Sequence, residues 1–373
     1  MSKIGVYIHI PFCVSKCAYC AFTSFRCDNA TIDAYIDALI AEIESTLNAD
    51  DIIDTLYIGG GTPSILRHED IRRIVDSVKR RATWMPREVT IECNPESLTR
   101  EKIEAYKDIG ITRISIGVQS LDDDILHTIG RVHSSNEAID KVRLAVETGM
   151  NTSVDMILGL PNSTLDDITH CVETFSDIGV QHISSYSLGV EPGTRLADMV
   201  DNGEVTLPSE DETVDQYEWA YRCLAEHGYH RYEVSNFARR GYESIHNTKY
   251  WTMDEYVGLG LASHSYSHGK RYYNTSNMSE YLTNMSSGKS VRTLDEILNK
   301  DDIFEETLML GMRLEKGVSI DVLDGILGES FVSKYKRNLA KVREYTTIYR
   351  GRLAIKPEYM NVMNTIIGDI LFG

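Results

Sequence analysis

Three cysteines near the N-terminus have a spacing that could hold metal. Cys13, Cys17 and Cys20 form a C-x3-C-x2-C run. Thiolates are soft ligands suited to zinc, copper(I) or iron–sulfur clusters. A structural zinc needs a fourth ligand, which Cys27 or His9 could supply. Three thiolates can instead hold three irons of a [4Fe–4S] cube. The fourth iron then stays open to a ligand that chelates through an amino and a carboxylate group.

The remaining cysteines do not share this arrangement. The chain has seven cysteines, and an odd number without an export signal is not typical of a disulfide framework. Only the first three share a short loop. We therefore expect the other four to stay outside the cluster: Cys27, Cys93, Cys171 and Cys223.

Alternating strand-like and helical segments must position this loop. Runs rich in Val, Ile and Tyr predict strands at Ile4–Ile10, Thr55–Ile58, Glu88–Cys93, Arg113–Val118, Thr152–Leu158 and His182–Tyr186. Apolar residues at helical spacing predict helices at Thr31–Asn48, Glu69–Arg80, Arg100–Lys107, Asn136–Glu147 and Thr164–Ser176. Thr31 is a candidate N-cap for the first helix. The pattern predicts a parallel α/β sheet, either an incomplete barrel or a doubly wound sheet.

Composition and charge restrict the class of protein. The chain has 373 residues, of which 42% are hydrophobic and 25% charged, with a net charge of −18. These values exclude a mostly disordered or collagen-like chain. Such an acidic protein is not expected to bind nucleic acid over a broad surface. No apolar run approaches the roughly 18 residues of a membrane span, and the N-terminus lacks the apolar core of a signal peptide. We expect a cytoplasmic protein.

The C-terminal part has a different pattern. Helical segments run from about Glu306 to Arg343, followed by two short strands and a last helix. This order predicts a small winged-helix-like domain. Phe331–Lys356 carries eight basic residues and one acidic residue. DNA binding by this stripe is opposed by the acidity of the rest of the chain, whereas peripheral contact with a membrane surface is compatible with it. The expected domains are 1–190, 191–300 and 301–373.

Several motifs, in order along the chain, resemble one enzyme superfamily. The cysteine spacing is similar to that of the radical S-adenosylmethionine (SAM) superfamily. Within this superfamily, five segments resemble motifs of the coproporphyrinogen dehydrogenase (HemN-like) group. They are Tyr7-Ile8-His9-Ile10-Pro11-Phe12-Cys13, Gly59-Gly60-Gly61-Thr62-Pro63-Ser64, Ile91-Glu92, Gly117-Val118-Gln119-Ser120 and Asp155-Met156-Ile157-Leu158-Gly159-Leu160-Pro161. The resemblance covers nearly the whole chain. It implies an α/β fold, an incomplete (β/α)6 radical SAM barrel with a small C-terminal α+β winged-helix-like domain.

The resemblance also implies roles for individual residues. Cys13, Cys17 and Cys20 would ligate a [4Fe–4S] cluster. The SAM contacts would be Tyr7, Tyr19, Gly60, Gly61, Thr62, Glu92, Gln119, Arg131 and Asp155. Glycines let the backbone approach the SAM ammonium, and an arginine offers a fixed fork of donors to its carboxylate.

Two features separate the branches of the group. The dehydrogenase branch has a further cysteine where this chain has Phe22, and it has an N-terminal extension before the motif that starts here at Tyr7. Both differences favour the HemW heme-chaperone branch, although its usual Cys-Asp-Phe is replaced by Cys20-Ala21-Phe22. The segment from His246 to Trp251 matches that branch's H-N-x-x-Y-W signature.

His246 could be a ligand of heme iron or a purely structural residue. A neutral imidazole is a common axial ligand of heme iron, but a buried histidine with aromatic neighbours is equally compatible with the sequence. Weaker candidate iron ligands are Cys223, His264 and His268.

The resemblance implies a cytoplasmic heme chaperone with a [4Fe–4S] cluster, SAM and heme as cofactors. It would bind heme or another tetrapyrrole and deliver heme to acceptor proteins such as membrane respiratory enzymes. The alternative is an enzyme of porphyrin biosynthesis, an oxygen-independent coproporphyrinogen III oxidase. Whether SAM is turned over and whether the chain forms a homodimer stay open.

Overall fold

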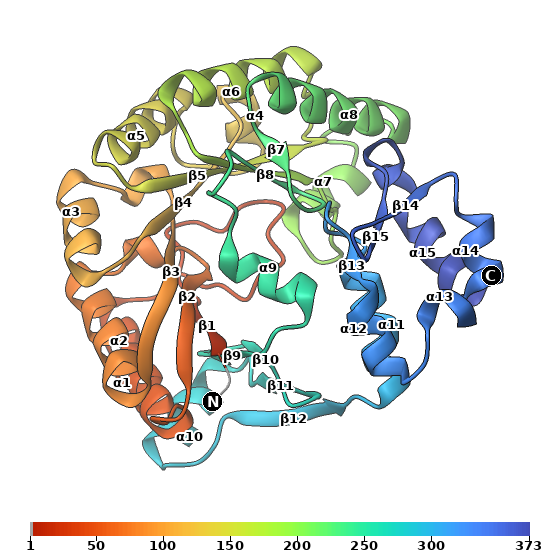
Figure 1. The fold of residues 1–373 in the computed structure, drawn as a ribbon. Coiled ribbons are helices and arrows are strands. Elements are labelled where there is room, and N and C mark those ends of the chain that lie inside the picture. Colours follow the sequence, from red (N-terminus) through yellow and green to blue (C-terminus); the bar gives the residue numbers. More distant parts are fainter. Residues whose placement is uncertain (1–2) are drawn as a thin grey trace.

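One curved sheet dominates the computed structural model, which describes residues 3–373 (Figure 1). Its twelve strands lie in the order β12-β11-β10-β9-β1-β2-β3-β4-β5-β6-β8-β7. Their bounds are β1 Lys3–Ile10, β2 Ile52–Gly60, β3 Thr83–Cys93, β4 Arg113–Gln119, β5 Asn151–Leu158, β6 His182–Ser187, β7 His230–Arg231, β8 Asn236–Ala238, β9 Tyr256–Leu259, β10 His264–Ser267, β11 Lys270–Asn274 and β12 Arg292–Ile297. Strands β1 to β6 are parallel, and β9 joins β1 in parallel.

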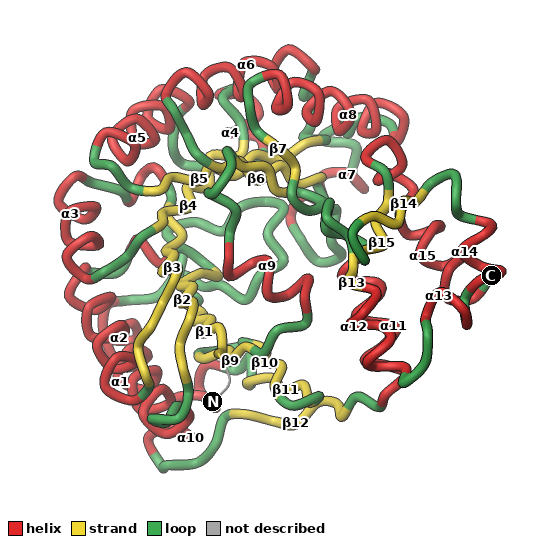
Figure 2. The backbone as a smooth tube through the Cα atoms, in the orientation of Figure 1, coloured by secondary structure: helices red, strands yellow, loops and turns green. Residues whose placement is uncertain are grey.

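Helices cover the convex face of the sheet (Figures 1 and 2). Up to the end of β12 the helices are α1 Asn29–Thr46, α2 His68–Arg81, α3 Arg100–Ile109, α4 Asp123–Thr128, α5 Ser135–Glu147, α6 Leu165–Ile178, α7 Arg195–Asp201, α8 Glu210–Glu226, α9 Ile245–Thr252 and α10 Met278–Ser286. Single 3-10 turns lie at Pro63–Ile65 and Pro95–Ser97. Within residues 3–373 the end strands β12 and β7 do not pair with each other. The fold is therefore the expected incomplete parallel barrel, extended at both ends by antiparallel strands.

The predicted strands and helices of the first half are present, with ends shifted by a few residues. The first helix begins earlier than expected. Its N-cap is Asp28, whose carboxylate accepts the Thr31 N–H at 2.8 Å, so Thr31 lies in the first turn and is not the cap. The strands from β7 to β12 are absent from the sequence prediction, because they are only two to six residues long and lack a strong period-2 pattern.

The concave face of the sheet is polar. On β4, Arg113, Ser115 and Gln119 occupy alternate positions and line the cavity described below. Helix α9 lies on this inner side of the sheet, unlike the covering helices (Figure 1). One part of the inner face therefore lines the open cavity, and another part packs against α9.

The C-terminal segment lies between the two ends of the curved sheet (Figure 2). It contains α11 Lys300–Gly311, β13 Val318–Ser319, α12 Ile320–Leu327, α13 Phe331–Lys334, α14 Lys336–Lys341, β14 Thr346–Tyr349, β15 Arg352–Ile355, a 3-10 helix Pro357–Val362 and α15 Met363–Phe372. The expected hairpin is present, and β13 adds a third strand to it.

This segment has its own apolar core, whose buried residues run along the sequence from Phe304 to Ile370. The segment also contacts both ends of the sheet. Glu306 pairs with Arg271 of β11 at 2.5 Å, and the Glu315 N–H donates to the Tyr232 carbonyl at 3.0 Å. The domain boundaries at residues 190 and 300 stay predictions. None of the helices in the described part of the chain is long and apolar enough to cross a membrane.

Candidate functional site

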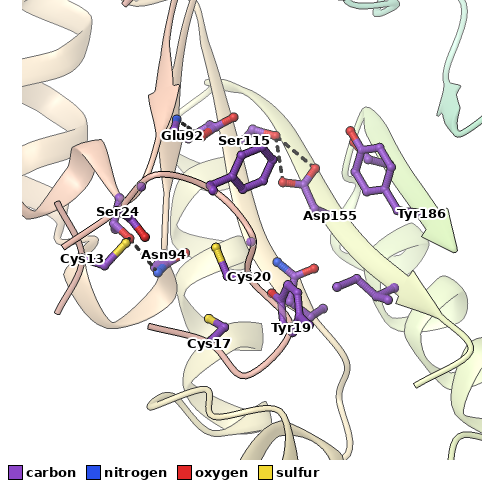
Figure 3. A pocket seen from close by; sticks show the side chains of 18 of the residues that line it. Cys13, Cys17, Tyr19, Cys20, Ser24, Glu92, Asn94, Ser115, Asp155 and Tyr186 are labelled. Atoms are coloured by element: carbon purple, nitrogen blue, oxygen red, sulfur yellow. Dashed lines mark hydrogen bonds between the residues drawn. The ribbon is translucent and has the colours of Figure 1, made fainter. Parts of the chain in front are cut away.

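A cavity of about 680 Å³ lies on the concave side of the sheet, at the carboxyl ends of the parallel strands. Its walls come from the cysteine loop, from β2 to β6 and from α9. Eleven of the residues expected to bind the cluster or SAM line it: Cys13, Cys17, Tyr19, Cys20, Gly60, Gly61, Thr62, Glu92, Gln119, Arg131 and Asp155. Figure 3 shows the three cysteines on one loop that faces Asn94, Glu92 and Asp155.

Backbone contacts hold the cysteine loop against the glycine-rich turn after β2. The Gly61 N–H donates to the Ile10 carbonyl and the Thr62 N–H to the Phe12 carbonyl, both at 2.8 Å. A Cβ atom on Gly61 would lie 2.7 Å from the Phe12 oxygen, so this close approach requires glycine. The turn therefore fixes the loop that carries the cysteines.

The cysteine sulfurs have donors positioned to stabilise thiolate charge. All three thiols are free of disulfides. Arg131 Nη1 lies 3.3 Å from Cys17 Sγ, and Thr62 Oγ1 lies 3.5 Å from Cys13 Sγ. Outer hydrogen bonds of this kind orient and tune metal ligands. This donor set fits an iron–sulfur cluster ligated by three thiolates.

The zinc alternative lacks a fourth ligand in this arrangement. Both ring nitrogens of His9 are engaged, Nδ1 with the Tyr7 hydroxyl and Nε2 with the Thr23 carbonyl, each at 3.0 Å. Cys27 is exposed and does not line the cavity. Within residues 3–373, no three His, Cys, Asp or Glu side chains are grouped to hold a single ion.

Tyr7 is not among the residues that line the cavity, so its contact with SAM stays a prediction. Its hydroxyl is taken by His9, and its ring stacks on Tyr57 with centroids 6.2 Å apart. Tyr57 itself lines the cavity. Tyr57 therefore lies between Tyr7 and the cavity, which Tyr19 and Tyr186 line as well.

Two carboxyl groups face the cavity, and within residues 3–373 neither forms an ion pair. Glu92 accepts hydrogen bonds from the Tyr57 hydroxyl at 2.7 Å and from the Gly60 N–H at 2.9 Å. Burial, with a smaller contribution from Asp155, raises the Glu92 pKa to about 7. Burial also raises the pKa of Asp155, to which the Ser115 hydroxyl donates at 3.2 Å. An ammonium or a hydroxyl donor placed here would find prepared acceptors.

Arg131 is buried between the cysteine loop and the end of β4. Its Nη2 donates to Asn94 Oδ1 at 3.0 Å and to the Gly117 carbonyl, while its Nε has no acceptor. Burial lowers the Arg131 pKa, but Cys17 and Tyr19 outweigh this and raise it. At the same strand end, Gln119 has a left-handed backbone with φ of 75°. Such strain in a non-glycine residue is concentrated at functional sites.

Several lining residues escaped the sequence reasoning. They are polar or aromatic side chains that face inward from the strands or from α9: Tyr57, Asn94, Arg113, Ser115, Ser184, Tyr186 and Asn247. For some of these residues, the sequence does contain a pattern that indicates an inward-facing position. Polar residues at every second position of a buried strand, as in β4, indicate an inner face that meets something polar.

His246 is enclosed beneath this cavity. Its side chain is buried, Nδ1 is paired with the Thr55 hydroxyl at 2.8 Å, and Nε2 with the Tyr250 hydroxyl at 2.9 Å. Burial, and secondarily Lys249, lowers the His246 pKa to about 3. With both nitrogens engaged, this imidazole is not placed to ligate a heme iron. The structure supports the structural interpretation that the sequence left open.

The rest of α9 is anchored in the same way. The Glu88 carboxylate accepts the N–H groups of Ile245 and His246 at 2.9 and 3.0 Å. Lys249 forms a buried ion pair with Asp54 at 2.9 Å. The H-N-x-x-Y-W segment therefore holds a helix inside the curved sheet, and of its residues Asn247 reaches the cavity.

Comparisons with known proteins identify the family. A model of the radical SAM superfamily matches residues 7–175. The heme chaperone HemW of Bacillus subtilis (strain 168) is 33% identical over 375 residues, covering 99% of this chain and 98% of that protein. The heme chaperone HemW of Lactococcus lactis is 35% identical over 353 residues, covering 94% of this chain and 92% of that protein. The chain belongs to the HemW family.

A solved structure supports the fold of this HemW-family chain. The structure of the Escherichia coli coproporphyrinogen III oxidase (HemN), described as a radical SAM enzyme, has a TM-score of 0.85. The match covers 99% of this chain and 90% of the HemN chain, with 18% sequence identity. This likeness shows a shared fold. Together the comparisons confirm the family and the fold expected from the motifs.

Proposed function

We propose that this protein is a heme chaperone that binds a [4Fe–4S] cluster, SAM and heme, and that it passes heme to acceptor proteins. Membership of the HemW family supports the chaperone function. One observation supports the cofactor part: three free cysteines lie on a loop beside a polar cavity, where the Nε atoms of Arg113 and Arg131 have no acceptor within residues 3–373.

In this proposal Cys13, Cys17 and Cys20 ligate the cluster. Arg131 binds the SAM carboxylate, while Glu92 and Asp155 accept hydrogen bonds from its ammonium and ribose hydroxyls. Gly60, Gly61, Thr62, Tyr19 and Gln119 complete the contacts. When bound, the cluster would supply an electron to the SAM sulfonium, and that chemistry belongs to the cofactors.

Delivery to membrane respiratory enzymes belongs to the same proposal. The hairpin of β14 and β15 exposes Ile348 and Tyr349, which are 52% and 65% accessible, beside the basic Arg350. An apolar tip flanked by positive charge is suited to an anionic membrane surface. Exposure of this tip supports transfer of heme close to a membrane.

The alternative activity is oxygen-independent oxidation of coproporphyrinogen III. The HemN-like fold favours it, because the same cavity could hold a tetrapyrrole. The residue at the position of the dehydrogenase's further cysteine opposes it. Phe22 is 68% exposed at the edge of the cavity and has no thiol to offer.

One experiment separates the two functions. The protein is reconstituted anaerobically with iron and sulfide, and is then assayed in parallel for hemin binding by absorbance and for SAM-dependent coproporphyrinogen decarboxylation. We expect a saturable Soret band and no decarboxylation above the protein-free rate. Robust formation of protoporphyrinogen would overturn the chaperone function in favour of the enzyme.

A further inference from the structure

Arg113 is a buried cation at the end of the cavity away from the cysteines. Its side chain is 2% exposed and lines the cavity. Nη1 donates to the Tyr242 carbonyl at 3.2 Å, but Nε has no acceptor. Within residues 3–373 no carboxylate lies within 4.0 Å of this guanidinium. A buried charge without a counter-ion is costly, and such groups are normally paired.

The cavity therefore has two separate guanidinium groups. Arg131 contacts the Gly117 carbonyl near the carboxyl end of β4, whereas Arg113 is the first residue of that strand. Along the strand, the Cα atoms of Arg113 and Gly117 lie roughly 13 Å apart, at roughly 3.3 Å per residue. In the proposed function the SAM carboxylate lies at Arg131. Arg113 is then free to meet a different anion.

Within residues 3–373, the neighbouring titratable groups form no ion pair with Arg113. Asp155 is close enough for the Arg113 charge to lower its pKa against the larger effect of burial, but the hydrogen bond that its carboxyl accepts at 3.2 Å comes from the Ser115 hydroxyl. Burial, and then Arg113 itself, lowers the pKa of His182 well below its usual value. An imidazole is either neutral or positively charged, so His182 cannot serve as the counter-ion of Arg113 in either state.

We propose that Arg113, together with Asn247 of α9, forms a carboxylate-binding subsite for the tetrapyrrole. This inference rests on the proposed function, because heme carries propionate side chains. Arginine binds a carboxylate through two parallel hydrogen bonds. Asn247 lines the same cavity and is half-buried, so its amide can donate to the same group. The subsite seats one propionate inside the curved sheet and leaves His246 out of ligand binding.

The test compares hemin with hemin dimethyl ester, in which the propionates carry no charge. Both are titrated by absorbance into reconstituted wild-type protein, Arg113→Gln and Arg231→Gln. Arg231 is a matched control, since it is 3% exposed and also has an unpartnered Nε, but it does not line the cavity. We expect Arg113→Gln to weaken hemin binding about 10-fold or more. Its affinity for the ester, and both affinities of Arg231→Gln, should stay at wild-type values.

Other outcomes contradict the subsite. Equal weakening of hemin and ester binding, or no weakening, removes Arg113 from propionate recognition. Weaker SAM binding by Arg113→Gln, with hemin binding intact, assigns the carboxylate to SAM. If Arg113→Gln does not fold, Arg113→Lys replaces it, and wild type must still bind hemin more tightly than its ester. Wild-type protein that binds neither porphyrin contradicts the proposed function itself.

Discussion

The cavity and the surroundings of α9 are both buried and polar, but they differ in how their polar groups are paired. Around α9, Glu88 accepts backbone N–H groups, His246 has partners on both nitrogens and Lys249 pairs with Asp54. In the cavity, Arg113 and Arg131 each have an Nε without an acceptor.

This difference distinguishes a scaffold from a binding site. A buried polar network whose members satisfy one another stabilises one arrangement of the chain. Buried groups left without partners are destabilising until a ligand supplies them. The signature histidine belongs to the first kind of region, and the arginines belong to the second. The predictions below test this assignment.

The largest effect is expected at the cluster. Cys17→Ala removes one of the three thiolates, so the brown colour and the iron and sulfide of the reconstituted protein should be lost. Iron analysis and absorbance measure this. The matched control is Cys27→Ala, because Cys27 is exposed and outside the cavity. Unchanged iron and sulfide in Cys17→Ala would remove this residue from the cluster.

The next effect is on folding, around α9. His246→Ala leaves the hydroxyls of Thr55 and Tyr250 without their partner. It should lower the free energy of unfolding by about 2–4 kcal/mol, measured by denaturant titration. The Soret band of bound heme should be unchanged in the folded fraction. His170→Ala, an exposed histidine on α6, serves as the control.

A loss of the Soret band in His246→Ala at unchanged stability would reverse the comparison. It would place this histidine on the heme iron after a rearrangement of α9.

A smaller effect is expected at the SAM end of the cavity. Arg131→Ala removes a buried cation, and SAM affinity should fall roughly 10-fold or more, which is about 1.4 kcal/mol. Equilibrium dialysis on protein of equal iron content measures it. Arg143→Ala, on the exposed face of α5, should bind SAM as wild type does. Wild-type affinity in Arg131→Ala would place the SAM carboxylate elsewhere.

The two regions also differ in the sign of their contribution to the pH dependence of stability. The folded Glu92 has a pKa of about 7, above its ordinary value of 4.5, so the native state holds a proton that the unfolded state has lost. Its contribution to stability therefore falls as pH rises from about 4.5 to about 7. Glu92→Gln should flatten this decline by on the order of 1–3 kcal/mol.

His246 should act in the opposite direction. Its folded pKa is about 3, below its ordinary 6.5, so only the unfolded state takes up a proton between these values. Stability should fall as pH drops through this window, and His246→Ala should reduce that fall. Chemical denaturation of the cofactor-free protein at several pH values measures both slopes. If Glu92→Gln and His246→Ala changed the slope relative to wild type in the same direction, the distinction would be contradicted.

The sequence was sufficient for the elements and for the cluster motif because both are local. Alternation and helical spacing located β1 to β6 and five of the helices between them, whereas the short helix α4 is absent from the prediction. The spacing of Cys13, Cys17 and Cys20 lies within one loop, so it needed no knowledge of the fold. The resemblance also implied that Glu92, Arg131 and Asp155 contact SAM, and all three line the cavity.

Only the tertiary structure decided which polar side chains are left for a ligand. His246 and Asn247 are adjacent in the sequence, yet one is enclosed between Thr55 and Tyr250 while the other lines the cavity. Arg113 shows the same point, because its lack of a counter-ion depends on β4, α9 and the loop that carries Tyr242. Residue type and spacing determine which groups can bind. Whether a buried group is already paired depends on segments far apart in the chain, and no local pattern records it.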